Sequence, residues 1–168
     1  MKASKVNEFL KIIKENDIYP VFQPIVNLQT GKVEGYEALS RINRKNTGLM
    51  IADLFVIAEK AGCVWKLEKL CRKKALKQAV KKPKKVKLFL NVDGHIFQDA
   101  TFIQGFTNRK ASRIGVPISD IVFEITERSD IENYQILQRI MKHYIDQGFE
   151  IALDDVGAGY SGLNRVVN

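Results

Sequence analysis

The sequence predicts an α/β fold whose sheet is mostly parallel and begins with an antiparallel hairpin. Two observations support this prediction. Short apolar segments alternate with longer segments of helical period along most of the chain, and strands that alternate with helices pair in parallel through right-handed crossovers. The first two apolar segments are separated by only three residues, which is too short a connection for a parallel crossover.

The hairpin is expected over residues 18–42. Its strands cover 18–28 and 32–42, and the turn between them is Gln29-Thr30-Gly31. A turn of this length joins antiparallel neighbours. The sheet is therefore expected to start antiparallel and to continue parallel.

An amphipathic helix is expected before the hairpin, within residues 1–17. Val6, Phe9, Leu10 and Ile13 recur at the spacing of one helical face. The segment lacks the continuous apolar stretch of a secretory signal. We predict that it covers the core or connects to something upstream, and that the domain itself occupies residues 18–168.

The remaining strands and helices are expected in alternation. The strands are predicted at 33–36, 86–90, 121–123 and 149–153, and the helices at 51–61, 64–80, 102–114 and 131–145. In parallel α/β folds, above all in the barrel version, reacting groups lie at the carboxyl ends of the strands. The residues that follow these four strands are therefore the candidates for a functional site.

Each of these four strands is followed by an oxygen-bearing side chain. Glu37, Asn91 and Glu124 follow the first three, and the fourth ends in Asp154-Asp155 before a glycine-rich turn. Carboxylate and amide oxygens bind hard divalent cations, and a glycine-rich turn at a helix start lets backbone N–H groups approach a phosphate. Each residue alone also fits a solvated strand position or a turn former. Their recurrence at four strand ends favours a site for metal and phosphate.

The sequence also resembles the EAL-domain cyclic di-GMP phosphodiesterase family, from about residue 18 to the end. Six motifs carry the resemblance, in the family's order and at its spacing. They are Phe22-Gln23-Pro24-Ile25, Gly35-Tyr36-Glu37-Ala38-Leu39-Ser40-Arg41, Ala58-Glu59-x-x-Gly62, Asn91, Phe123-Glu124-Ile125-Thr126-Glu127 and Asp154-Asp155-Val156-Gly157-x-Gly159-Tyr160-Ser161. The resemblance implies a modified, TIM-like (β/α)8 barrel with an antiparallel first strand, which agrees with the predicted hairpin.

The resemblance implies hydrolysis of cyclic di-GMP to the linear dinucleotide, in bacterial second-messenger signalling, with two Mg²⁺ or Mn²⁺ ions. The metal ligands that it implies are Glu37, Asn91, Glu124, Asp154 and Asp155. Glu37, Asp154 and Asp155 are the catalytic members of this set. Two ions about 4 Å apart suit phosphodiester cleavage because together they activate water and neutralise the developing charge.

The resemblance also implies residues that touch the substrate or support the site. Gln23, Leu39 and Arg41 are expected to contact cyclic di-GMP, and the planar fork of Arg41 suits a phosphate. Glu127 is expected to steady a loop near the metals. The alternative interpretation of Arg41 is structural: it would form an ion pair with Glu37 on the sheet surface.

The end of the chain departs from the family's pattern. A late catalytic Lys, a Glu proposed to act on the water and a late Gln have no counterpart in the 168 residues, so the chain resembles the N-terminal two-thirds of a barrel domain. We expect the 168-residue form to be inactive by itself, with its open side covered by terminal helices or by association, a homodimer included. The alternative function is a non-hydrolysing cyclic di-GMP receptor or a regulatory interaction domain.

The charge of the chain is concentrated in one segment. The formal net charge is +8, and eleven basic residues and one acid, Glu68, fall between Lys66 and Lys87. This pattern indicates a solvated outer helix face, and the alternative is a surface for an acidic partner. No nucleic-acid motif accompanies it, so no polymer partner is expected.

The two cysteines and the hydropathy indicate the compartment. Cys63 and Cys71 show neither a zinc-site spacing nor a disulfide framework, so reduced thiols in the cytoplasm are expected. No apolar run reaches the length of a membrane span, and no membrane insertion of this segment is expected.

Overall fold

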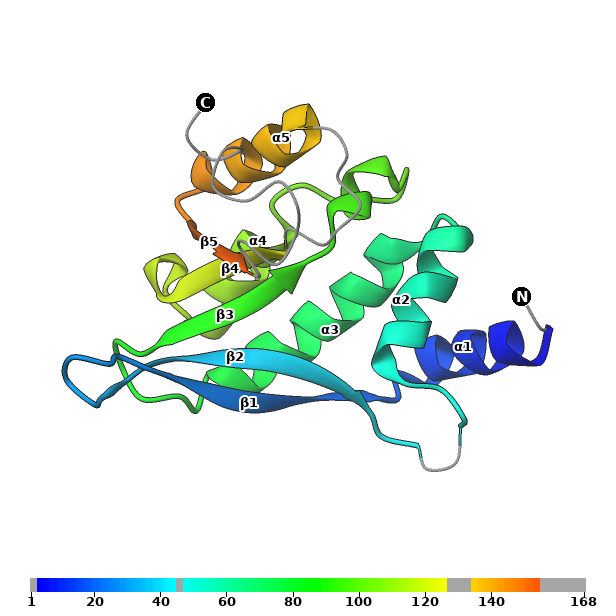
Figure 1. The fold of residues 1–168 in the computed structure, drawn as a ribbon, viewed down its shortest axis with the longest axis horizontal. Helices are drawn as coiled ribbons and strands as arrows, with labels where there is room; N and C mark the ends of the chain where they lie inside the picture. The colour runs from blue at the N-terminus through cyan, green and yellow to red at the C-terminus, as the bar shows by residue number, and fades with distance from the viewer. Residues whose placement is uncertain (1–2, 45–46, 127–133, 155–168) are drawn as a thin grey trace.

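The computed structural model describes residues 3–44, 47–126 and 134–154. Their framework is one five-stranded sheet in the order β1-β2-β3-β4-β5, with helices packed against it (Figure 1). The strands are β1 (Ile18–Val26), β2 (Val33–Ile42), β3 (Lys87–Val92), β4 (Ile121–Thr126) and β5 (Glu150–Asp154). β1 and β2 pair antiparallel and every later neighbour pairs in parallel. The predicted α/β sheet with an antiparallel first strand is therefore confirmed.

The hairpin turn is built by one asparagine and one glycine. The side-chain oxygen of Asn27 accepts hydrogen bonds of 3.0 Å from the N–H groups of Gln29 and Thr30. Gly31 follows with a φ of +66°, a conformation that costs glycine little. The backbone then returns, and the N–H of Asn27 donates to the carbonyl of Lys32. The turn chemistry fixes where β2 begins.

The helices largely follow the predicted ranges. They are α1 (Ala3–Glu15), α2 (Ile51–Lys60), α3 (Val64–Ala79), α4 (Phe106–Ile114) and α5 (Tyr134–Ile145), with short 3₁₀ turns η1 (Gly94–Gln98) and η2 (Ile118–Asp120). The predicted start of the 102–114 helix is wrong, because Gly105 adopts a φ of +68° directly before α4. Residues 131–133 of the predicted last helix lie outside the described residues.

α1 buries a face that differs slightly from the predicted one. Phe9, Ile12 and Ile13 are buried, whereas Leu10 is 51% exposed. The prediction that Leu10 faces the core is therefore wrong, and Ile12 takes its place. Burial of each large apolar side chain stabilises the fold by about 1.5–3 kcal/mol, so α1 is firmly attached to the rest of the described core.

The two faces of the sheet have different environments. Leu88, Leu90 and Val92 of β3 are buried in the helix-covered core. Because side chains alternate along a strand, Phe89 and Asn91 point to the opposite face. That face carries the candidate site, and its backbone position is set by the apolar core behind it.

Candidate active site

The parallel register brings three of the predicted residues together on the sheet face that lies away from the helices. Asn91 of β3 pairs with Glu124 of β4, and Glu37 of β2 pairs with Phe89, two residues before Asn91. Alternation of side chains therefore directs all three to one face. The Asn91 amide donates a hydrogen bond of 2.7 Å to the Glu37 carboxylate.

The fourth predicted residue, Asp154, lies on the same face at the end of β5. Glu124 pairs with Ala152, two residues before Asp154, so the two carboxylates project in the same direction. The charge of Asp154 acts on Glu124. Four neighbouring parallel strands thus contribute one oxygen-bearing side chain each, as the sequence predicts.

Glu124 lies in an environment that disfavours its charged form. Its Oε2 atom is buried and has no hydrogen-bond partner among the described residues. Burial, and then the negative charges of Glu37 and Asp154, raise the pKa of Glu124 to about 7. A cation between these carboxylates would neutralise the repulsion and give the buried oxygen a partner.

The donor set fits a hard divalent cation. Carboxylate and amide oxygens are the ligands that Mg²⁺ and Mn²⁺ prefer, and Glu37, Asn91, Glu124 and Asp154 provide only such atoms. Within residues 3–44, 47–126 and 134–154, no group of three or more His, Cys, Asp or Glu side chains is arranged so that it could hold a metal ion, so the fit rests on the chemistry of the donor atoms. Asp155, the fifth predicted ligand, lies outside the described residues.

The predicted substrate-contacting residues share the face of Glu37. Gln23 of β1 pairs directly with Glu37, and Leu39 and Arg41 follow Glu37 at alternate positions of β2. Gln23 and Arg41 are exposed, and the Arg41 guanidinium donates a 2.8 Å hydrogen bond to the carbonyl of Ser40. No contact between Arg41 and Glu37 is seen, so the ion-pair interpretation of Arg41 is not supported.

A second predicted residue, besides Asp155, cannot be placed. Glu127, the expected loop-stabilising residue, lies outside the described residues.

Packing explains why the residue at position 35, beneath the site, is a glycine. A Cβ atom added at Gly35 would lie 2.3 Å from the Phe89 ring. Gly35 and Phe89 precede Glu37 and Asn91 by two residues, so they occupy the same face one step lower. The absence of a side chain at Gly35 allows the Phe89 ring to fill the space under the carboxylates.

A buried ion pair behind the site was not singled out from the sequence. Glu68 and Arg72 of α3 are 2% and 3% exposed, and their charged groups are 3.0 Å apart. The Glu68 carboxylate accepts a 3.0 Å hydrogen bond from the N–H of Asp93, two residues after Asn91. The sequence signal that could have revealed this ion pair is that Glu68, the only acid within the basic segment, precedes Arg72 by four residues.

Arg72 extends this link to two further helices. Its guanidinium donates to the hydroxyl of Thr107 in α4 at 3.2 Å and to the hydroxyl of Tyr144 in α5 at 2.8 Å. It also lies 4.8 Å from the centre of the Phe123 ring in β4. Burial raises the pKa of Tyr144 to about 12, so the phenol stays neutral. The ion pair therefore connects the helix layer to the end of β3 and to the middle of β4.

A set of carboxylates at the carboxyl ends of parallel strands is typical of α/β proteins whose functional site lies at that edge of the sheet. The comparisons with known proteins agree. The EAL domain family model matches residues 6–168. The chain belongs to the EAL domain family, and the predicted resemblance is confirmed.

Curated relatives cover most of this chain. A probable cyclic di-GMP phosphodiesterase of Escherichia coli is 30% identical over 97% of the chain, and a cyclic di-GMP phosphodiesterase of Pseudomonas aeruginosa is 28% identical over 88% of it. The matched regions make up 33% and 26% of those two proteins. The chain thus spans about a third or less of the length of these two relatives.

Solved structures confirm the fold. The FimX EAL domain superposes with a TM-score of 0.81 over 99% of this chain and 68% of its own, at 17% identity, a likeness that shows the fold alone. A standalone EAL protein of Vibrio cholerae, solved in a cyclic di-GMP-bound form, is 31% identical with a TM-score of 0.66, covering 90% of this chain and 62% of its own. The described five-stranded sheet is accordingly part of the TIM-like EAL barrel. No helix in the described part of the chain is long and apolar enough to span a membrane.

Proposed function

We propose that this chain contributes the strand-end ligands of a metal-dependent cyclic di-GMP phosphodiesterase. The observation that carries the proposal is the alignment of Glu37, Asn91, Glu124 and Asp154 on one sheet face, with a buried and unpartnered oxygen on Glu124. Relatives named as cyclic di-GMP phosphodiesterases support the substrate. A Klebsiella pneumoniae neighbour of the same fold is a complex with manganese and cyclic di-GMP, which supports the choice of Mg²⁺ or Mn²⁺.

The reaction is hydrolysis of one phosphodiester bond of the ring. The oxygen of a water molecule bonds to phosphorus, one P–O ester bond breaks, and the leaving oxygen takes up a proton, which yields the linear dinucleotide. Two divalent ions, when bound, would supply an activated water and neutralise the charge that develops on the phosphoryl oxygens. Glu37, Asn91, Glu124 and Asp154, with the adjacent Asp155, would hold the two ions.

The substrate would lie over the same face of β1 and β2. Arg41 is exposed and can exchange its bond to the Ser40 carbonyl for a phosphate, to which a guanidinium presents two parallel donors. Gln23 supplies an amide beside Glu37, and Leu39 supplies an apolar contact between Glu37 and Arg41. Glu127 is proposed to steady a neighbouring loop.

Mn²⁺ binding measured by electron paramagnetic resonance tests the ligand set. We expect Glu124→Gln to weaken Mn²⁺ binding at least about tenfold, because a charged ligand contributes more than about 1.4 kcal/mol. Glu34→Gln is the matched control, since Glu34 is an exposed carboxylate of β2 that bonds to Asn27 instead. Equal affinities in the wild type, Glu124→Gln and Glu34→Gln would contradict the site.

Calorimetry and product analysis then separate the enzyme from the receptor. In the presence of Ca²⁺, Arg41→Ala should weaken cyclic di-GMP binding about ten- to a hundredfold. Release of the linear dinucleotide by the native protein that contains these residues supports the phosphodiesterase. Tight binding of cyclic di-GMP without release of product would identify a receptor.

A further inference from the structure

A second cavity lies on the other face of the sheet, between the end of α3 and the first three strands. Its volume is about 550 Å³, within the range of about 300–1,000 Å³ of small-molecule sites. Tyr36 lines it, whereas the adjacent Glu37 belongs to the candidate active site. Because consecutive strand residues point to opposite faces, the sheet itself separates the two sites.

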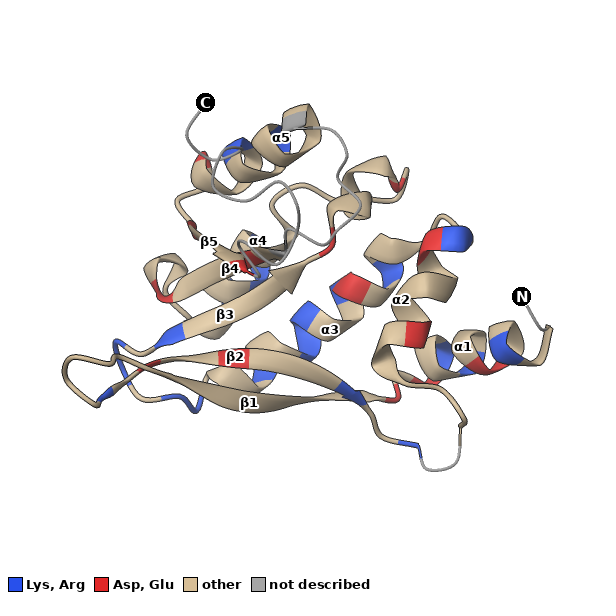
Figure 2. Cartoon of the chain, in the orientation of Figure 1, with Lys and Arg blue, Asp and Glu red and all other residues tan. Residues whose placement is uncertain are grey.

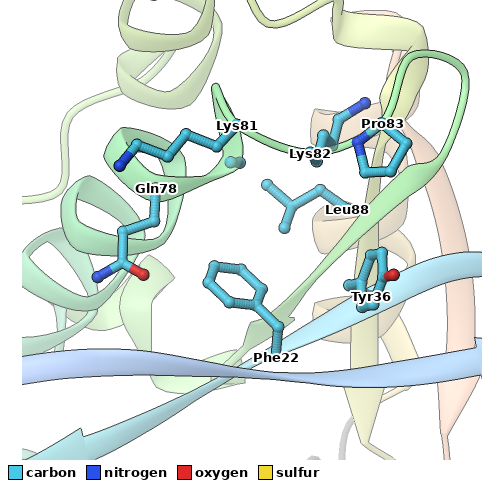
Figure 3. A pocket seen from close by; sticks show the side chains of 8 residues that line it. Phe22, Tyr36, Gln78, Lys81, Lys82, Pro83 and Leu88 are labelled. Atoms are coloured by element: carbon cyan, nitrogen blue, oxygen red, sulfur yellow. The ribbon is translucent and has the colours of Figure 1, made fainter.

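The floor of the cavity is apolar and partly aromatic. Tyr36 of β2 and its register partner Leu88 of β3 lie side by side, and Phe22 of β1 points into the space from below (Figure 3). Tyr36 and Phe22 are only partly buried, so their rings are available to a ligand. Such a floor suits a flat ring system, since aromatic rings pack in offset or edge-to-face contact.

The rim of the cavity on the α3 side is polar and positive. The ends of the Gln78 and Lys81 side chains gather there, opposite Tyr36 and Leu88 (Figure 3). Lys82 also lines the cavity but is already paired with Asp120 at 2.6 Å. Lys81 is exposed, and no ion pair of Lys81 is found among the described residues. Its ammonium is therefore available to an incoming anion.

The wider surroundings favour negative charge at this rim. Basic residues follow α3 and the turn after it (Figure 2), and none of the described residues that line the cavity is an Asp or a Glu. The carbonyl groups at the end of α3 are engaged, because the N–H groups of Lys81 and Lys82 donate to the carbonyls of Gln78 and Ala79. A positive rim around an apolar floor raises the local concentration of anions.

We propose that this cavity is a second ligand site, for a planar aromatic anion. The ring of the ligand would lie between Phe22 and Tyr36, and its carboxylate or phosphate would accept hydrogen bonds from Lys81 and Gln78. Aromatic carboxylic acids and nucleoside monophosphates share this chemistry. The site is separate from the proposed phosphodiesterase site and does not depend on it.

Chemical-shift titration of the ¹⁵N-labelled 168-residue chain tests the proposal. The probes are naphthalene-2-carboxylate, guanosine 5′-monophosphate and the neutral 2-naphthylmethanol. At least one anion should shift the amide signals of Phe22, Tyr36, Gln78 and Lys81, and the neutral probe should bind at least about tenfold more weakly than the carboxylate if the carboxylate binds. Binding of only one anion identifies the source of the ligand. No saturable shift of these amides by either anion would overturn the proposal.

Two charge reversals on α3 and the turn after it sharpen the test. Lys81→Glu should weaken binding of the anion at least about tenfold, because it removes a charged hydrogen-bond donor and adds repulsion. Lys73→Glu makes the same charge change at an exposed position of α3 that does not line the cavity, and it should change the affinity by less than about threefold. Equal effects of the two variants would show a diffuse charge effect and overturn the site. Glu124→Gln should leave anion binding unchanged, which separates this test from that of the proposed function.

Discussion

Replacing Arg72 by methionine should destabilise the domain far more than replacing Glu68 and Arg72 together. Arg72 is 3% exposed and contacts Glu68 at 3.0 Å, Tyr144 at 2.8 Å and Thr107 at 3.2 Å. Its removal leaves the Glu68 carboxylate buried with the Asp93 N–H as its remaining donor. Breaking a buried ion pair in this way costs about 3–5 kcal/mol.

The pH dependence of Arg72→Met has a definite sign. Burial already raises the pKa of Glu68, although the charge of Arg72 opposes that rise. Without Arg72 the pKa in the folded state rises further. A carboxyl with a raised pKa in the folded state favours folding below its unfolded pKa, and this contribution is lost as the pH rises. The deficit of Arg72→Met should therefore be larger at pH 8 than at pH 5.

The double variant Glu68→Gln/Arg72→Met removes both charges and keeps an acceptor for the Asp93 N–H. Such replacements of buried pairs are often near neutral, so we expect a loss of less than about 2 kcal/mol and a clear non-additivity in the mutant cycle. Urea unfolding followed by circular dichroism measures each free energy of unfolding, with Lys73→Met on the exposed face of α3 as the control. A loss below about 1 kcal/mol for Arg72→Met, or strict additivity, would refute the reasoning.

Three further predictions follow from the site and its support. In excess chelator at pH 8, Glu124→Gln should stabilise the fold by about 1–2 kcal/mol after allowance for solvent screening, because the pKa of Glu124 is raised to about 7 and its charged form is disfavoured. Thermal unfolding measures the gain in stability, and a gain as large at pH 5 as at pH 8 would contradict the prediction. Gly35→Ala should lower the free energy of unfolding by about 1–3 kcal/mol through overpacking against Phe89, and adding Phe89→Leu should recover part of that loss. Denaturant unfolding measures both changes, and no recovery would show that the cause lies in the backbone at Gly35. Burial raises the pKa of the Cys71 thiol to about 11, so about one part in a thousand should be thiolate at pH 8 and Cys71 should react slowly with iodoacetamide. Mass spectrometry measures the rate of alkylation, and a rate as fast as that of a free thiol would refute its burial.

The strands and their functional ends could be predicted because they depend on local rules. Short, mostly apolar segments of three to five residues indicate the parallel strands, and the three-residue turn admits only an antiparallel hairpin. Once the strands are parallel, their carboxyl ends meet, and Glu37, Asn91 and Glu124 are brought together by register alone. The roles of these residues in metal binding stay predictions.

The missed features depend on contacts between distant segments. The start of α4 is set by the left-handed Gly105. The segment before it is held by Asp99, whose carboxylate accepts hydrogen bonds from the N–H groups of Thr101 and of Trp65 in α3. Exposure of Leu10 depends on how α1 rotates against its neighbours. Likewise, the i, i+4 spacing of Glu68 and Arg72 indicates an ion pair but not its burial, because the further partners Thr107 and Tyr144 are 35 and 72 residues away from Arg72.

The geometry also explains why the site contains an amide. Neighbouring strands lie about 4.8 Å apart, so carboxylates on consecutive strand ends cannot separate without breaking the ladder. Asn91 stands on β3, between Glu37 on β2 and Glu124 on β4. A carboxylate at position 91 would replace a 2.7 Å hydrogen bond to Glu37 with a contact between like charges. The neutral amide keeps the oxygen of a proposed metal ligand in place and limits the repulsion, which adds to burial in raising the pKa of Glu124 to about 7.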